Sequence, residues 1–228
     1  MNNNGERINN LLKKSDISDT KDIWIDADAF NEVDDQFAIV HALLADTVNS
    51  EVNLIGMSAA PFHNQARKTK SHGHGMELSY AEMERILNIL DCGWNGGVYR
   101  GSMSILEGNK KDYIESEGAQ ALCEVVMKNY SNEKPLYVLT LGAHTNIASA
   151  LKMNPRIRGK IIICSLGGLA GQVHSFKDFN YKQDILSAKS VFSSGVAIIH
   201  FPSLDSKLRM LSTTRWELKA NLQNKSPI

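Results

Sequence analysis

Apolar runs of strand length alternate along this chain with longer segments whose apolar residues recur at helical spacing. The short runs predict strands at residues 23–25, 52–57, 135–142, 160–165 and 196–201. Helical periodicity predicts helices at residues 33–45, 77–90, 118–130, 145–152 and 185–194. This alternation is typical of an α/β protein with an open, mostly parallel sheet flanked by helices.

The length of 228 residues suits one domain of ordinary size. Residues 1–21 are polar and predict a lead-in with a short helical piece within 6–14, whereas residues 22–228 predict one α/β domain that includes a further helix at about 206–222. Hydrophobic residues make up 43% of the chain, enough to bury a core. Basic and acidic residues number 25 each, which gives no electrostatic case for binding nucleic acid or an acidic membrane.

The three cysteines, Cys92, Cys123 and Cys164, share no short spacing. An odd and sparse set favours a reducing compartment over a disulfide framework. No run approaches the length of about 18 apolar residues that a membrane span requires, and the N-terminus lacks the apolar segment of a secretory signal. The sequence therefore predicts a cytoplasmic protein without a membrane partner.

An acidic cluster of Asp26, Asp28, Asp34 and Asp35 stands where the first predicted strand passes into the first predicted helix. Neighbouring carboxylates repel, and burying them costs free energy unless positive charge compensates. A helix N-terminus supplies about half a charge, whereas a cation such as Ca²⁺ or Mg²⁺ supplies more and prefers oxygen ligands. The alternative is that these residues cap the helix and face water, and for Asp34 alone the two interpretations are equally reasonable.

Small or polar residues also follow other predicted strands, at His63-Asn64, Leu141-Gly142 and Gly167-Gly168. Since the carboxyl ends of parallel strands share one edge of a sheet, these residues are expected to converge with the acidic cluster. His72 and His74 lie in a glycine-containing stretch, which favours a mobile lid over a metal site. His144 stands near this edge at the start of a predicted helix, and His200 lies in a strand-like run that favours the core or a sheet edge.

Four segments resemble those of the calcium-dependent nucleoside hydrolases of the inosine/uridine-preferring type. DADAFNEVDD (26–35) is similar to the family signature D-x-D-x-G-x-D-D, and AAPFHN (59–64) stands in the place of a loop that ends in Asn. LGAHTNIASAL (141–151) looks like LGPLTNIA, and 178–202 is similar to EFN-x-x-x-DPEAA followed by a strand. The matches run in family order from about residue 22 to residue 205, and together they are specific.

The resemblance implies a Rossmann-like nucleoside hydrolase fold. It also implies hydrolysis of the N-glycosidic bond of a ribonucleoside, to ribose and free base, by a calcium-bound water. Carried over by position, the Ca²⁺ ligands would be Asp28, Asp35 and the backbone carbonyl of Leu141. Asp28 and Asp34 would be catalytic, Asp26 would support them, and the ribose would contact Asp34, Asn64, Asp178 and Asn180. The implied partners are a small ribonucleoside and further copies of the chain in a homo-oligomer.

The sequence departs from the family pattern in three places. The acidic loop is two residues longer than the signature, with residues 30–32 where a tight glycine turn is usual, so the loop is expected to bulge. Asp178 stands where the family has Glu. The sequence stops at Ile228, before the part of the family that brings a further aspartate ligand and the histidine that protonates the leaving base. We therefore expect a C-terminally truncated member with an incomplete fold there and impaired activity.

Two other functions fit parts of the sequence. An aspartate-based phosphatase would use Asp26 as nucleophile, Asp28 as acid and base, and Mg²⁺. That class also needs a lysine and a second acidic pair at later strand ends, where this chain has glycines and Asn. A non-catalytic remnant that binds ribose or a nucleoside is the second alternative.

Overall fold

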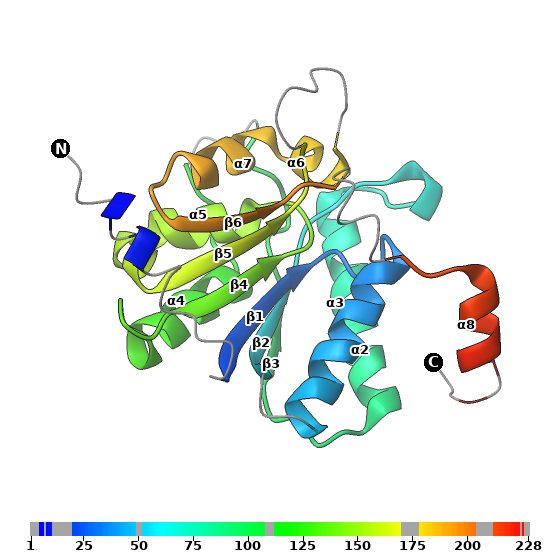
Figure 1. The fold of residues 1–228 in the computed structure, drawn as a ribbon. Coiled ribbons are helices and arrows are strands. Elements are labelled where there is room, and N and C mark those ends of the chain that lie inside the picture. Colours follow the sequence, from blue (N-terminus) through cyan, green and yellow to red (C-terminus); the bar gives the residue numbers. More distant parts are fainter. Residues whose placement is uncertain are drawn as a thin grey trace.

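Six parallel strands form the centre of this computed structural model (Figure 1). The structure describes residues 5–6, 8–10, 20–48, 52–107, 112–169, 178–203, 212–223 and 225. Within these residues the strand order is β3-β2-β1-β4-β5-β6, and each neighbouring pair is parallel. The strands are β1 (Lys21–Ala27), β2 (Val52–Ala59), β3 (Gly97–Tyr99), β4 (Leu136–Thr140), β5 (Ile161–Leu166) and β6 (Ala197–Phe201).

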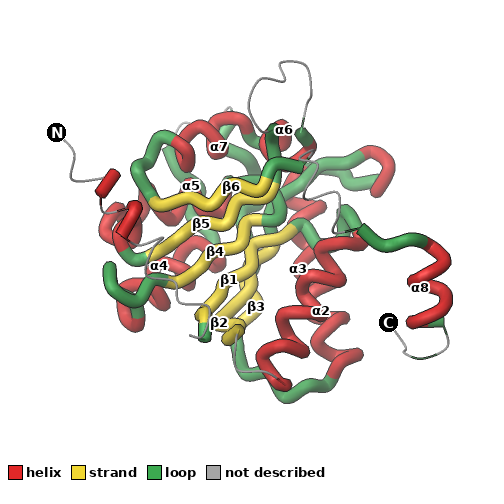
Figure 2. Tube along the Cα trace, viewed as in Figure 1, coloured by secondary structure: helices red, strands yellow, loops and turns green. Residues whose placement is uncertain are grey.

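Helices lie on both faces of this sheet (Figure 2). They are α2 (Val33–Val48), α3 (His72–Leu90), α4 (Glu117–Asn129), α5 (Thr145–Met153), α6 (Phe179–Gln183), α7 (Ile185–Phe192) and α8 (Arg215–Leu222), with short 3-10 helices η1 (Gln65–Arg67) and η2 (Pro155–Gly159). Helices α2 and α3 pack on the face of β1 to β3, whereas α4, α5 and α7 lie on the opposite face. The predicted open, parallel α/β sheet is confirmed.

Strand β1 illustrates why both faces of the sheet are covered. Its side chains alternate, so that Ile23 and Ile25 pack with residues of α2 and α3, whereas Trp24 packs with residues of α4 and α5. Gly56 on β2 makes room for the indole, because a Cβ there would lie 2.5 Å from Cζ3 of Trp24. A strand buried on both sides needs apolar residues at nearly every position, which is the pattern that predicted it.

The predicted elements correspond closely to the observed ones. The five predicted strands are β1, β2, β4, β5 and β6, and the helices predicted at 33–45, 118–130, 145–152 and 185–194 are α2, α4, α5 and α7. Strand β3 and helix α6 were not predicted, since three and five residues are too few to reveal a period. Residues 206–211 of the predicted C-terminal helix, and residues 7 and 11–14 of the predicted N-terminal one, lie outside the described residues.

The prediction of a mobile lid at the glycine-containing stretch around His72 and His74 was wrong. These residues form the first turn of α3, which Ser71 caps by accepting a hydrogen bond from His74 N. The glycines permit close packing instead: a Cβ at Gly75 would lie 2.0 Å from the carbonyl oxygen of Phe62. Sequence alone does not distinguish a glycine needed for close approach from one that allows mobility.

Two further observations concern the protein's environment. The three cysteines are free, with Cys123 buried and the other two half-buried. Among the helices described, none is long and apolar enough to cross a membrane.

Candidate active site

The strand ends of this sheet bring the predicted site residues to one edge. Asp26 on β1 pairs with Ser58 on β2 and with Thr140 on β4, so these three strands end at the same level. The chain order of the strands reverses between β1 and β4. Open α/β sheets bind ligands beyond the carboxyl ends of their strands at this kind of reversal. The acidic cluster therefore lies where the fold favours a ligand site.

Asp28 and Asp35 form a buried pair of carboxyl groups at this edge. Asp28 follows β1 and is 2% exposed, while Asp35 lies in the first turn of α2 and is 6% exposed. Burial raises the pKa of Asp28 to about 7, and burial together with the neighbouring carboxylates raises the pKa of Asp35 well above its usual range. Each carboxyl group affects the pKa of the other, and the buried Oδ2 of Asp28 has no hydrogen-bond partner.

The backbone after β4 lies directly against this pair. A Cβ at Gly142 would lie 2.9 Å from Oδ1 of Asp28, so the turn at Leu141 approaches the carboxylate at a distance that glycine permits. The carbonyl of Leu141 accepts a hydrogen bond of 2.7 Å from Nδ2 of Asn180. Two carboxylates and a carbonyl are all oxygen donors, the set that a hard cation prefers. The unpartnered, buried Asp28 oxygen also fits such an ion.

This set is small for a metal site. The described residues contain no group of three or more His, Cys, Asp or Glu side chains arranged to hold a metal ion. A cation held by Asp28, Asp35 and the Leu141 carbonyl would therefore need further oxygen ligands from water or substrate.

Asp26 lies behind the pair, in a fully buried hydrogen-bond network. Its Oδ1 accepts hydrogen bonds from Ser58 Oγ at 2.5 Å and Asn146 Nδ2 at 2.8 Å, while Oδ2 has no partner. Burial raises the pKa of Asp26 to about 6, against these two hydrogen bonds, which lower it. Asn146 also receives a hydrogen bond from the backbone N–H of Ser102. The sequence analysis missed Asn146, although it lies in the segment that resembles LGPLTNIA.

Asp34 and Asn64 lie nearer the surface of the same edge. Asp34 is exposed at the start of α2, where its Oδ1 accepts a hydrogen bond from the backbone N–H of Asp35. Asn64 is half-buried and caps η1 by accepting a hydrogen bond from Ala66 N. Its Nδ2 donates to Oδ1 of Asn31 at 2.8 Å.

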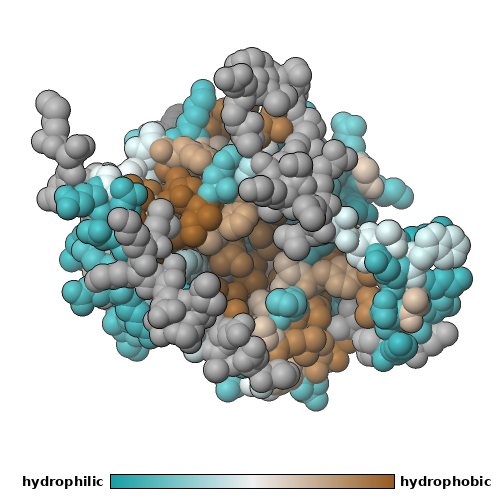
Figure 3. All heavy atoms as spheres, in the orientation of Figure 1, coloured by the Kyte–Doolittle hydropathy of each residue, from teal (hydrophilic) through white to brown (hydrophobic). Residues whose placement is uncertain are grey.

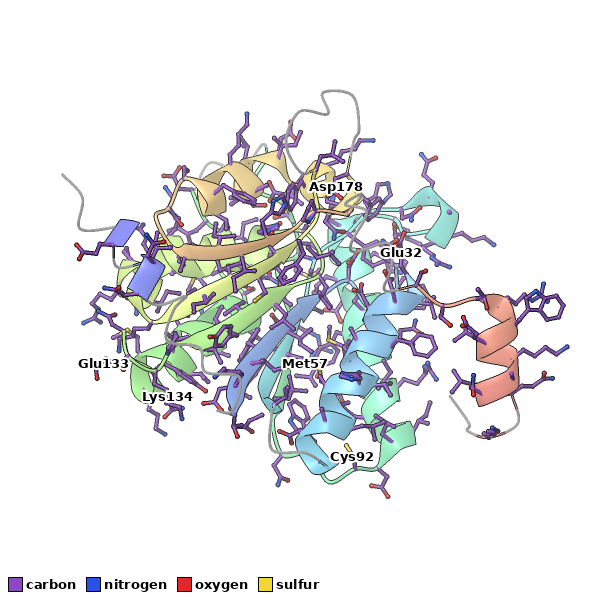
Figure 4. All side chains as sticks on the ribbon, viewed as in Figure 1. Glu32, Met57, Cys92, Glu133, Lys134 and Asp178 are labelled. Atoms are coloured by element: carbon purple, nitrogen blue, oxygen red, sulfur yellow. The ribbon has the colours of Figure 1, made fainter. Side chains whose placement is uncertain are left out.

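Asp178 and Asn180 reach the site from the start of α6. Asp178 accepts hydrogen bonds from Tyr181 N and from Ser203 Oγ, which orient its carboxylate. Asn180 donates to the carbonyls of Leu141 and Leu166, at 2.7 and 3.3 Å. Figure 4 shows Asp178 and Glu32, which immediately precedes α2, on the same side of the molecule. The structure thus brings Asn180 and the Leu141 carbonyl into direct contact.

A second network, which the sequence did not predict, supports α6. His144 is fully buried, and its Nε2 lies 2.8 Å from Ser165 Oγ, which in turn lies 2.8 Å from the hydroxyl of Tyr181. Burial and the nearby His200 lower the pKa of His144 to about 4, so this imidazole is neutral near pH 7. His200 lies on β6, an edge strand among the described residues, as predicted.

Comparison with known proteins agrees with this geometry. A model of the family described as inosine-uridine preferring nucleoside hydrolase matches residues 23–227. The chain belongs to this nucleoside hydrolase family. The match spans β1 to α8 and includes every residue of the site described above. A search of curated proteins found no match.

Solved structures share the fold of this nucleoside hydrolase family member. The purine-preferring ribonucleoside hydrolase from Gardnerella vaginalis has a TM-score of 0.58 and 23% identity, over 80% of this chain and 60% of that chain. The inosine-uridine preferring nucleoside hydrolase from Bacillus anthracis has a TM-score of 0.59 and 19% identity, over 88% of this chain and 70% of its own. The type III effector protein XopQ, solved with adenosine diphosphate ribose, has a TM-score of 0.54 and 11% identity, over 89% and 61%.

Proposed function

We propose that this chain hydrolyses the N-glycosidic bond of ribonucleosides, to give ribose and a free base, with Ca²⁺ held by Asp28, Asp35 and the Leu141 carbonyl. The observation that supports this most is the buried Asp28–Asp35 pair, with an unpartnered carboxylate oxygen, beside a backbone turn. Two adjacent buried carboxylates are costly in a folded protein unless a cation or a shared proton compensates. Family membership supports the choice of reaction.

The residues around Asp28 and Asp35 have different roles in the proposed reaction. A divalent cation at this position supplies positive charge and makes a nearby water more acidic. Asp28 is our candidate for the group that accepts the proton of the attacking water. The sugar develops positive charge as the bond to the base breaks, and the carboxylates of Asp28, Asp34 and Asp35 stabilise that charge.

We assign the sugar hydroxyls to polar side chains on two sides of the same edge. Asp34 and Asn64 would contact the hydroxyls from the side of α2 and η1, and Asp178 and Asn180 from the side of α6. A polyhydroxylated ligand needs several fixed donors and acceptors. The hydrogen bonds that hold Asn64, Asp178 and Asn180 make these groups suitable, because little side-chain freedom is left to lose on binding.

The chain spans 60% of the length of the Gardnerella vaginalis hydrolase. Ribonucleoside hydrolysis by this chain is therefore a proposal. A cytoplasmic location is part of the same proposal and is supported by three free cysteines. The phosphatase alternative is less well supported, because Asp26, its nucleophile, is fully buried and bonded to two donors. A non-catalytic nucleoside-binding protein is the second candidate, and it would retain the same ribose contacts.

Turnover of nitrophenyl riboside, with Ca²⁺ and with a chelator, tests this proposal. Nitrophenolate leaves without a proton, so the assay needs no leaving-group acid. We expect Ca²⁺-dependent turnover that Asp28→Asn lowers by about 100-fold or more and that the control Asp91→Asn, at the exposed end of α3, leaves unchanged. No turnover by folded protein would exclude the hydrolase function for this chain, and riboside binding without turnover would favour the non-catalytic alternative.

A further inference from the structure

The longer acidic loop between β1 and α2 places one side chain in the interior. Asn31 is 2% exposed, although its neighbour Glu32 is exposed. The backbone N–H of Asn31 donates to the carbonyl of Asp28 at 2.7 Å, which closes a turn and directs the loop inward. The expected bulge is therefore folded against the site.

Asn31 contacts both halves of the candidate site. Its side-chain Oδ1 accepts a hydrogen bond of 2.8 Å from Nδ2 of Asn64, and its backbone N–H donates to the carbonyl of Asp28. Its backbone carbonyl accepts a hydrogen bond of 2.5 Å from Nε of Arg67, on η1. One buried residue thus joins Asp28, proposed as a Ca²⁺ ligand, to the Asn64 amide proposed for ribose.

These contacts fix which way the Asn64 amide faces. Oδ1 of Asn64 accepts from Ala66 N at 2.9 Å, so its Nδ2 is the atom directed at Asn31. The backbone N–H of Asn64 donates to Thr69 Oγ1, which holds the residue's main chain in place. One N–H and one lone pair of the Asn64 amide are then left for a ligand. Without Asn31, nothing described on that side would hold Nδ2.

We infer that Asn31 is a positioning residue, which presents the Asn64 amide to a ribose and links it to the backbone turn at Asp28. This inference rests on the proposed function and extends it to a residue outside the sugar and cation contacts. A buried asparagine that accepts one hydrogen bond and donates another transmits geometry without itself touching the ligand.

A double-mutant cycle with nitrophenyl riboside tests the inference. We expect Asn31→Leu to raise KM about 10-fold while kcat stays within about 2-fold, and Asn64→Leu to do the same, because each variant loses the contact that the Asn64 amide makes with ribose. The KM of the double variant should be no higher than that of either single variant, because the two residues act as a unit. Asn88→Leu, at an exposed position of α3, is the matched control. Additive losses, or an unchanged KM in Asn31→Leu, would overturn the inference.

A measurement without turnover separates this inference from the proposed function. In the free protein, the side-chain N–H protons of Asn64 should exchange with solvent more slowly than those of exposed Asn88, and Asn31→Leu should abolish the difference. Nuclear magnetic resonance of the assigned side-chain amides gives both rates. Equal rates for Asn64 and Asn88 in the wild-type protein would refute the role of Asn31, whether or not the enzyme turns over. Slow Asn64 exchange in an inactive protein would remove only the hydrolase function.

Discussion

At the scale of single residues, the site contains acidic side chains that are buried although folding does not require their burial. Asp26, Asp28 and Asp35 are nearly or fully buried, and burial raises the pKa of each. A protein that only needed to cap α2 would use exposed carboxylates, as Asp34 does. The buried acids therefore reduce stability in the ion-free protein, and a bound cation would reverse this cost.

Asp28→Asn should therefore stabilise the protein when no divalent ion is present. The pKa of Asp28 rises from an ordinary value of 3.8 to about 7 in the folded state. The neutral form is thus favoured on folding, and this stability is lost as pH rises from about 4 through about 7. At pH 8 in chelator, we expect a Tm several degrees above that of the wild type and a flatter pH profile. Added Ca²⁺ should raise the Tm of the wild type much more than that of the variant.

Thermal unfolding between pH 5 and 8, in chelator and in Ca²⁺, measures both effects. A variant that is less stable than the wild type in chelator at pH 8 would show that the Asp28 carboxylate is structural. It would also remove the main support for a cation at this position.

At the scale of elements, helix α6 carries Asn180 and is capped by Asp178, but it is too short to be stable alone. It is held by hydrogen bonds from Asn180 to two strand-end carbonyls and by the ring of Tyr181, which packs on Gly167-Gly168. The phenol hydroxyl of Tyr181 adds the contact to Ser165, which connects onward to His144. The position of the sugar-binding residues therefore depends on the turn after β5.

Gly168→Ala should displace α6, and Gly93→Ala provides a closely matched control. Both glycines have φ of +69°, so alanine adds about 1 kcal/mol of left-handed strain at each position. A Cβ at Gly168 would lie 2.6 Å from Cε2 of Tyr181, whereas a Cβ at Gly93 would meet nothing within 4 Å. We expect Gly168→Ala to lose more stability than Gly93→Ala and to raise KM for nitrophenyl riboside, which Gly93→Ala should not change. Urea unfolding and KM values decide this, and equal behaviour of the two variants would contradict it.

At the scale of the whole molecule, apolar side chains remain at the surface beside the site's sheet. Phe201 on β6 is 38% exposed, and α2 carries Val33, Phe37 and Leu44 at 59%, 42% and 44% exposure. The opposite side of α2 packs into the core through Ile39 and Leu43. Figure 3 shows hydrophobic surface gathered over this face of the molecule. Because α2 is apolar on two sides, we expect another protein surface to pack against its exposed apolar side as well.

We expect this surface to cause self-association, in line with the predicted homo-oligomer. Phe37→Ser combined with Leu44→Ser should lower the apparent mass at high concentration while the Tm changes little, because both side chains are already partly in water. Light scattering over a concentration series, with Asn88→Ser as control, measures the change. A wild-type protein that stays monomeric at every concentration would refute the prediction.

Much of this architecture was predictable because it depends on local pattern. Strands buried on both faces are continuous apolar runs, and amphipathic helices have a period, so five of the six described strands and most helices were found. The convergence of Asp28, Asp35 and Leu141 followed from the rule that parallel strands end at one edge, whereas Asn180 was assigned to the site through the family resemblance. Short elements such as β3 and α6 were not predicted, because their formation depends on contacts with neighbouring elements rather than on a periodic sequence pattern.

The sequence by itself determined the fold class, the family and the edge at which the acids gather. Only the tertiary structure decided which acids are buried: Asp34 faces water and Asp35, one residue later, does not. It also decided that the glycines near His72 pack closely rather than move, and that Asn31 turns inward to meet Asn64. The physical reason is that burial and hydrogen bonding depend on residues distant in the chain, whereas periodicity depends only on adjacent ones.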